Sequence, residues 1–249
     1  MQKRQLVADA LDRTGCGKLL RLAPSWRGVL ILNYHRIGEF RHSLLDRNLW
    51  SASTEDFDQQ MRTIIRDFDI ISLNELGPAL RNRRSRAVMI TFDDGYVDNY
   101  IEAFPVLKAH GAPATFFITT GFLDVPQIPW WDEIAWMVRM CRLPHIPANP
   151  WTGGPIPFDE PDRERAIRRV LAAYKILEGA STAVFMSFLA EALETGRAPD
   201  YIGHELWMTW SMIREMSQSR MSFGGHTVNH PILANITPEA QDYEVGECR

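Results

Sequence analysis

The sequence has few cysteines, no long apolar run and little net charge. Its three cysteines lie far apart with no Cys-x-x-Cys pair, which favours neither a disulfide framework nor a thiolate metal site and is compatible with a reducing compartment. No segment approaches the roughly 20 apolar residues of a membrane-spanning helix. Charged residues also interrupt the first thirty positions, where a signal peptide would be apolar. We therefore expect a cytoplasmic protein without a transmembrane segment.

Acidic and basic residues nearly balance. The chain has 249 residues, with 27 Lys and Arg against 31 Asp and Glu, a formal net charge of -4. This balance gives no long-range attraction to nucleic acid or anionic lipid and favours a neutral or weakly charged substrate. The length suffices for one full core, and an α/β barrel of this size is ordinary. We predict one catalytic domain and no nucleic-acid partner.

Strand-like and helix-like segments alternate along much of the chain. Apolar residues at helical spacing occur at 57–68, and a further helix is expected at 99–110. Short apolar runs typical of strands cover residues 28–34, 70–73, 87–92 and 114–119. The first run is apolar enough to predict a strand covered on both faces. The alternation predicts a parallel α/β sheet or barrel with its site at the carboxyl ends of the strands.

The alternation stops between about 122 and 205. Helical segments near 131–141, 161–177 and 182–193 are separated there by proline-rich connections, which indicates a helical insertion over the barrel mouth. Tryptophans of this segment could stack on sugar rings, but we favour packing because this side chain buries a large area wherever it lies; they are Trp130, Trp131, Trp136 and Trp151. Residues 1–27 are expected to form an N-terminal helical extension before a domain at 28–249.

Two motifs carry acidic and imidazole groups. Asp93 and Asp94 end the run 87–92 and precede a glycine, and His226 and His230 lie four residues apart much later. One carboxylate with two imidazoles is the ligand set of an open catalytic metal site, and the second carboxylate is then free to act as a base. Neighbouring strand residues point to opposite faces, so both acids can reach one site only where the chain turns. The histidine spacing suits a single helical turn, kept short by the proline that follows.

These motifs resemble those of a known family. Thr-Phe-Asp-Asp-Gly at 91–95 and His-Thr-Val-Asn-His at 226–230 resemble the signatures of the polysaccharide deacetylases, the NodB-like enzymes of carbohydrate esterase family 4. The resemblance implies a distorted (β/α) barrel with fewer than eight strands. It also implies a metal-dependent hydrolase that removes N-acetyl groups from N-acetylhexosamine units of a polysaccharide or glycan precursor. By the same resemblance, Asp93 is the general base, and the ligands of a divalent ion, with zinc favoured, are Asp94, His226 and His230.

Four further positions are candidates for the same site. The segment Tyr-His-Arg-Ile at 34–37 resembles an element of exopolysaccharide-type deacetylases, so His35 either lines the site or is a hydrogen-bonded residue at a strand end. Tyr96 either lines the pocket or packs beneath the turn. Thr227 and Asn229 are expected to orient the histidine motif, as outer partners do around metal ligands.

The sequence departs from the family pattern after His230. No later Leu-x-His motif supplies the catalytic acid, and no later Pro-Gly motif shapes the acetyl pocket. A helix that starts near Thr237 is expected to be still running at Arg249. We therefore expect the last barrel strands to lie beyond this sequence, which leaves the activity of the chain by itself open.

Two alternative functions remain from the sequence. One is an amidohydrolase acting on a small non-sugar amide, since a fold does not determine a substrate. The other is a catalytically inactive glycan-binding or scaffold protein. An iron oxygenase is disfavoured because no His-x-Asp motif precedes a distant histidine. The polymer, its linkage, the metal and the oligomeric state are left open.

Overall fold

A parallel β-sheet forms the centre of the protein. The computed structural model describes residues 28–81, 86–159, 161 and 163–248, so the predicted extension at 1–27 lies outside the described residues. The strands pair in the order β1 (Val29–Tyr34), β5 (Ala87–Phe92), β6 (Ala114–Ile118) and β9 (Met221–Gly225). A short strand, β4 (Asp69–Ile70), pairs in parallel with the start of β5. The predicted parallel α/β architecture is confirmed.

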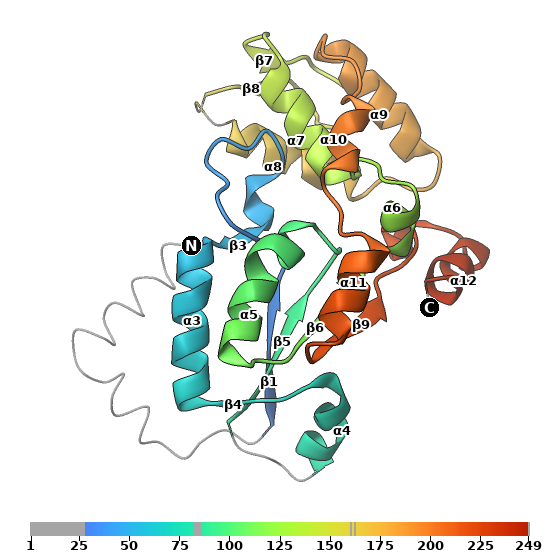
Figure 1. Ribbon diagram of the computed structural model, residues 1–249. Helices are drawn as coiled ribbons and strands as arrows, with labels where there is room; N and C mark the ends of the chain where they lie inside the picture. The colour runs from blue at the N-terminus through green and yellow to red at the C-terminus, as the bar shows by residue number, and fades with distance from the viewer. Residues whose placement is uncertain (1–27, 82–85, 160, 162, 249) are drawn as a thin grey trace.

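Side chains of β5 alternate between two apolar clusters. Val88, Ile90 and Phe92 belong to the main core, whose helices α3 (Thr54–Asp67) and α5 (Phe104–His110) lie side by side over one face of the sheet (Figure 1). The neighbouring positions Ala87 and Met89 belong to a smaller cluster against α4 (Leu73–Arg81). This period of two is what a strand between two packed layers requires. Packing on both faces holds β5 in place, and with it the Asp-Asp-Gly turn that follows.

Two expectations about the strands were wrong. We predicted that residues 28–34 are covered on both faces, but Leu30 and Ile31 are 43% and 50% exposed. Among the described strands, β1 pairs only with β5, so it lies at a sheet edge. The strand expected at 70–73 is shorter, because α4 begins at Leu73.

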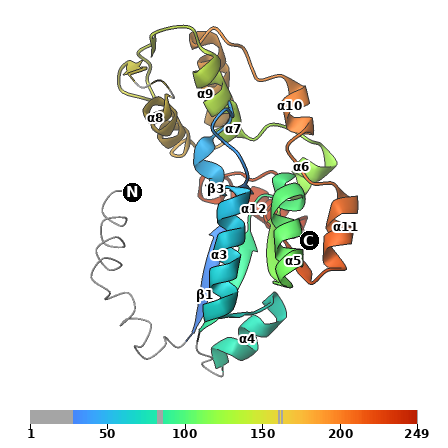
Figure 2. The ribbon, with the colours of Figure 1, turned by 60° about the vertical axis from the view of Figure 1, so that its left-hand side comes forward.

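The helices predicted between 122 and 205 are present and gather beyond one end of the sheet, while α4 lies at the opposite end (Figures 1 and 2). The elements are α6 (Thr120–Asp124), α7 (Trp130–Met140), the hairpin β7 (His145–Ile146) and β8 (Ile156–Pro157), α8 (Glu164–Tyr174), α9 (Ser181–Ala192) and α10 (Asp200–His204). Trp131 and Trp136 are buried in the core, and Trp151 packs edge-on against Phe185 at 5.3 Å between ring centroids. Packing is thus confirmed for these three. The bounds of the insertion stay a prediction.

Shorter elements complete the chain. The first part of the chain also contains β2 (Arg36–Ile37), which pairs in parallel with β3 (Trp50–Ala52), the 3₁₀ turn η1 (Arg47–Leu49) and the π-helical turn η2 (Asn99–Ala103). Helix α11 (Trp210–Ser217) leads into β9, and η3 (Leu233–Asn235) precedes α12 (Pro238–Gly246). The expectation that this last helix still runs at Arg249 was wrong, since α12 ends at Gly246, a residue type of low helix propensity. Within the described residues no helix combines the length and apolarity needed to cross a membrane; the cytoplasmic location stays a prediction.

Candidate metal centre

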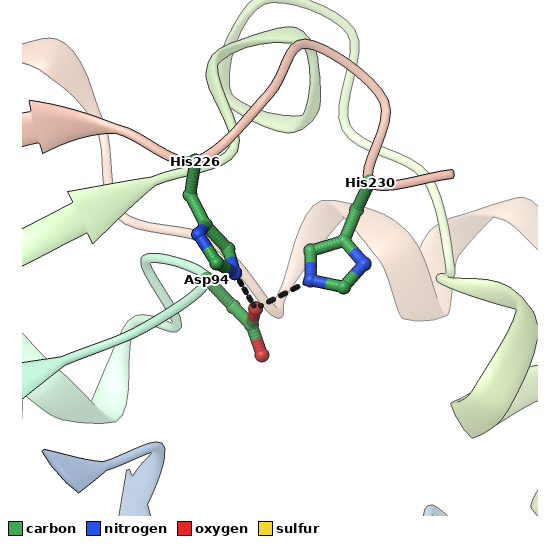
Figure 3. Close-up of side chains that lie close together, drawn as sticks. All are labelled: Asp94, His226 and His230. Carbon is green, nitrogen blue, oxygen red and sulfur yellow. Dashed lines mark ion pairs between the residues drawn. The ribbon is translucent and has the colours of Figure 1, made fainter. Parts of the chain in front are cut away.

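The ends of β5 and β9 bring the two sequence motifs together. Figure 3 shows the loop after β9 arching over Asp94, with both imidazoles directed at one carboxylate oxygen. The Oδ1 atom of Asp94 lies 3.7 Å from Nε2 of His226 and 3.2 Å from Nε2 of His230. One potential ligand atom from each of the three residues lies within 4.8 Å of the others. This is a span that one metal ion can bridge.

An unusual backbone turn places Asp94. Its φ angle is +75°, in the left-handed region, and that of Gly95 is +90°. Asp tolerates this region better than most non-glycine residues because its short side chain can hydrogen-bond locally. The turn removes the alternation that would send Asp93 and Asp94 to opposite faces, as the sequence had indicated.

The histidine loop is not the helical turn that its spacing suggested. Residues 226–230 have no helical hydrogen-bond pattern, and the φ angles of Thr227 and His230 are +67° and +53°. The loop is closed instead by the Thr227 hydroxyl, which accepts a hydrogen bond from the His230 amide at 3.0 Å. At its start, the His226 amide donates to the carbonyl of Ile118 in β6. Left-handed residues cannot be anticipated from a four-residue spacing, which explains the error.

Amides at the start of α6 hold one side of the histidine loop. The Thr120 amide donates to the carbonyl of Thr227 at 3.2 Å, and the Gly121 amide donates to the carbonyl of Val228 at 2.8 Å. The approach is close: a Cβ atom added at Gly121 would lie 2.6 Å from the Val228 oxygen. Glycine is therefore required there for the helix to touch the loop.

Glu244 of α12 holds the other side, and the sequence analysis missed it. Its Oε2 accepts hydrogen bonds from the amides of Val228 and Asn229, each at 2.8 Å, and its Oε1 accepts one from the Asn229 side chain at 2.9 Å. Glu244 is only 6% exposed. No motif in the sequence marks this glutamate, since it lies on an otherwise ordinary helix.

The three candidate ligands fit a divalent cation. Asp94 is 2% exposed, and its Oδ1 atom is buried without a hydrogen-bond donor among the described residues. A buried carboxylate oxygen in this position costs free energy unless a cation or a donor compensates its charge. Two imidazoles and one carboxylate are ligands that zinc accepts, with further positions left for water or substrate.

The two imidazoles differ in their acid–base behaviour. Burial lowers the pKa of His226, and the charge of the neighbouring His230 lowers it further. At His230 burial also favours the neutral ring, but the contact with Asp94 and its negative charge outweigh burial and raise the pKa. The lowered pKa favours the neutral form of His226, which can donate a lone pair to a metal.

Asp93 is oriented separately from Asp94. Its Oδ2 atom accepts a hydrogen bond from the Asn33 side chain at 2.8 Å, and the Thr91 hydroxyl donates to the side-chain Oδ1 atom of Asn33 at 3.1 Å. The Nε2 atom of His35 lies 4.0 Å from the same carboxylate oxygen. Asn33 was missed, although a polar residue inside the apolar run 28–34 was a signal for it. The carboxylate of Asp93 is therefore fixed beside the candidate ligands rather than among them.

A cavity of about 400 Å³ opens beside these groups. His35, Asp94 and His230 form part of its lining, and the helices α7 and α8 contribute Trp130, Trp131, Leu171 and Lys175 at their ends. Trp131 packs edge-on against His230, with 4.6 Å between ring centroids. The helical segment after β6 therefore forms a wall of the same cavity that the motif residues line.

Tyr96 lies beneath the turn and not in the cavity. It is fully buried, stacks on Trp207 and donates a hydrogen bond from its hydroxyl to Asp132 Oδ2 at 2.8 Å. Asp132 also accepts a hydrogen bond from the Asp46 amide at 2.9 Å, and Trp131 donates to the Tyr96 hydroxyl at 2.7 Å. Burial raises the pKa of Asp132 to about 7. This network ties the Asp-Asp-Gly turn to α7.

Comparison with known proteins agrees with the fold and with the Asp-Asp-Gly motif. Residues 81–140 match the family model described as polysaccharide deacetylase. The chain is 30% identical over 96 residues to a peptidoglycan-N-acetylmuramic acid deacetylase of Bacillus subtilis, covering 38% of this chain and 31% of the relative. It is 24% identical over 142 residues to the poly-beta-1,6-N-acetyl-D-glucosamine N-deacetylase of Escherichia coli K12, covering 50% of this chain and 21% of the relative.

A solved structure extends the likeness to most of the fold. The deacetylase PplD of Streptococcus pyogenes, determined in complex with acetate, superposes with a TM-score of 0.51 at 21% identity, covering 90% of this chain and 67% of that one. The shared fold is that of the NodB-like deacetylases. The matched segment, the relatives and the shared fold together support a NodB-like polysaccharide deacetylase. The chain spans less than a third of the length of the two curated relatives.

Proposed function

We propose that the protein is a metal-dependent hydrolase that removes N-acetyl groups from N-acetylhexosamine units of a polysaccharide or glycan precursor. The observation that carries this proposal is the buried Asp94 oxygen facing two imidazoles, with a second oriented carboxylate beside it. Similarity to the two curated relatives supports the same chemistry, because both are named as deacetylases of N-acetylated sugars.

The site residues divide into ligands and a base. Asp94, His226 and His230 would hold the ion, which we propose to be zinc from the carboxylate and imidazole donors. When bound, such an ion supplies Lewis-acid polarisation and lowers the pKa of water. Asp93 would accept the proton of the attacking water, a role open to it because its carboxylate is held by Asn33 and not by the ligand cluster.

The walls of the cavity would bind the sugar. His35 lines the cavity and lies 4.0 Å from the Asp93 carboxylate, so it would contact the substrate there. Thr227 and Asn229 act on the ligands and not on the substrate: one closes the histidine loop and the other links it to α12. Trp131, packed on His230, and His35 both line this cavity and would flank a bound acetamido group.

Acetate release tests the proposal. Purified protein, loaded with Zn²⁺ and then freed of excess metal, is expected to release acetate from N-acetylglucosamine oligomers, and chelation is expected to stop the reaction. Small non-sugar amides serve as the comparison substrates. Acetate release from small amides alone would instead establish the amidohydrolase alternative, and tight sugar binding without acetate release would establish a binding protein.

A further inference from the structure

Helix α12 docks on the protein through a carboxylate. A surface helix of a globular protein commonly buries an apolar stripe, yet Glu244 is the buried residue of α12. Each of its three hydrogen bonds ends on Val228 or Asn229, in the segment that joins the two candidate ligands His226 and His230. The buried contact of α12 is thus made with the loop that carries the two candidate ligands.

The histidine loop needs such an external support. The left-handed conformations of Thr227 and His230 cost free energy that the surroundings must compensate. The consecutive amides of Val228 and Asn229 point away from the loop, and a carboxylate that accepts from both fixes their direction. On the opposite side α6 donates to the carbonyls of the same loop. Donors from α6 and an acceptor from α12 therefore hold one peptide segment between them.

We propose that Glu244 is a positioning residue of the metal centre, which sets the separation and direction of the two imidazoles before metal binds. The inference rests on the proposed function only in taking His226 and His230 as ligands. Outer partners of metal ligands contribute in this way, and their loss costs about 10- to 100-fold in metal affinity. Glu244 acts through the loop, since its oxygens bond Val228 and Asn229 and not the imidazoles.

The test measures Zn²⁺ affinity of the full chain by competition with a chromophoric chelator. Glu244→Ala is expected to bind Zn²⁺ about 10- to 100-fold more weakly than the wild type. The Zn²⁺ affinity of Glu244→Gln is expected to lie between those of the wild type and Glu244→Ala. Its side-chain amide keeps one acceptor oxygen but places an NH₂ group against backbone donors. Glu247→Gln, an exposed glutamate three positions further along, is the matched control and is expected to keep wild-type affinity.

Thermal unfolding of the metal-free variants separates positioning from general stability. Affinity is measured at a temperature at which each variant is fully folded, and the visible spectrum of bound Co²⁺ reports the ligand geometry. A lower melting temperature with unchanged Zn²⁺ affinity and an unchanged Co²⁺ spectrum overturns the inference, as does a wild type that binds no Zn²⁺. If Glu244→Ala does not fold, Glu244→Gln decides alone. A wild type that binds Zn²⁺ in a Glu244-dependent way but releases no acetate refutes the proposed function and leaves this inference standing.

Discussion

Replacing Asp93 by asparagine should abolish most turnover and leave metal binding intact. The substitution is nearly isosteric, and the side-chain oxygen of the introduced amide can still accept the hydrogen bond that Asn33 donates at 2.8 Å. What is lost is the ability to take a proton. General bases contribute about 10²- to 10⁴-fold in rate, which corresponds to about 2.7–5.5 kcal/mol of barrier at about 1.36 kcal/mol per tenfold. Metal affinity should be retained because Asp93 is outside the ligand cluster.

His226→Ala provides the contrast, since it removes one of three candidate ligands and should lose the metal. Turnover is measured as acetate released from N-acetylglucosamine oligomers, and metal content by elemental analysis after dialysis. The expected pattern is an inactive Asp93→Asn protein with full metal content and a His226→Ala protein with little metal. Equal loss of metal from both variants would refute the division of roles between the two acids. Wild-type turnover by Asp93→Asn would remove Asp93 from the chemistry.

Two other substitutions probe the supports of the site. Gly121→Ala should weaken Zn²⁺ binding, because the added Cβ would lie 2.6 Å from the Val228 oxygen and displace the histidine loop. Gly246→Ala is the control, since no atom lies within 4 Å of the Cβ added there. Equal Zn²⁺ affinities of the two variants would contradict the expectation. Asp132→Asn should change how stability depends on pH. The folded-state pKa of Asp132, about 7, lies above the ordinary value of 3.8, so the folded protein binds this proton more tightly than the unfolded chain does. The resulting contribution to the free energy of unfolding is fully present below about pH 4 and is lost as pH rises through about 7. The unfolding free energy of the wild type, measured with urea, should therefore decline relative to the variant over this range, whereas a constant difference would show that Asp132 is not buried as an acid.

The site was predictable where a motif placed chemistry at a strand end. The residue types indicated a site of one carboxylate and two imidazoles, and the family resemblance assigned Asp94, His226 and His230 to it. The structure brings these three together because β5 and β9 flank β6 in one parallel sheet. Glu244 was not predictable, because nothing in its neighbourhood differs from a solvent-exposed helix. Its importance comes from where α12 lies, and that is a property of the fold and not of a local pattern.

The errors in the fold have similar causes. The apolar run 28–34 indicates a strand but not its place in the sheet, so the exposure of Leu30 and Ile31 at the edge could not be foreseen. The histidine spacing fits a helical turn as well as a loop, and the hydrogen bond from the His230 amide to Thr227 decides between them. Helices with strong apolar periodicity were located to within a few residues, as for α3 and α8.

Position 94 must meet two requirements, a left-handed backbone conformation for folding and a carboxylate for metal binding. A library of substitutions at this position could measure the two separately. With a φ angle of +75°, this position favours Asn, Asp and Gly for folding, while other side chains would add about 1–2 kcal/mol of conformational cost. Asn and Gly should consequently yield abundant but inactive protein, whereas Val or Ile should lower abundance as well. The backbone conformation therefore restricts which residues are tolerated at position 94, even in a homologue that has lost metal binding.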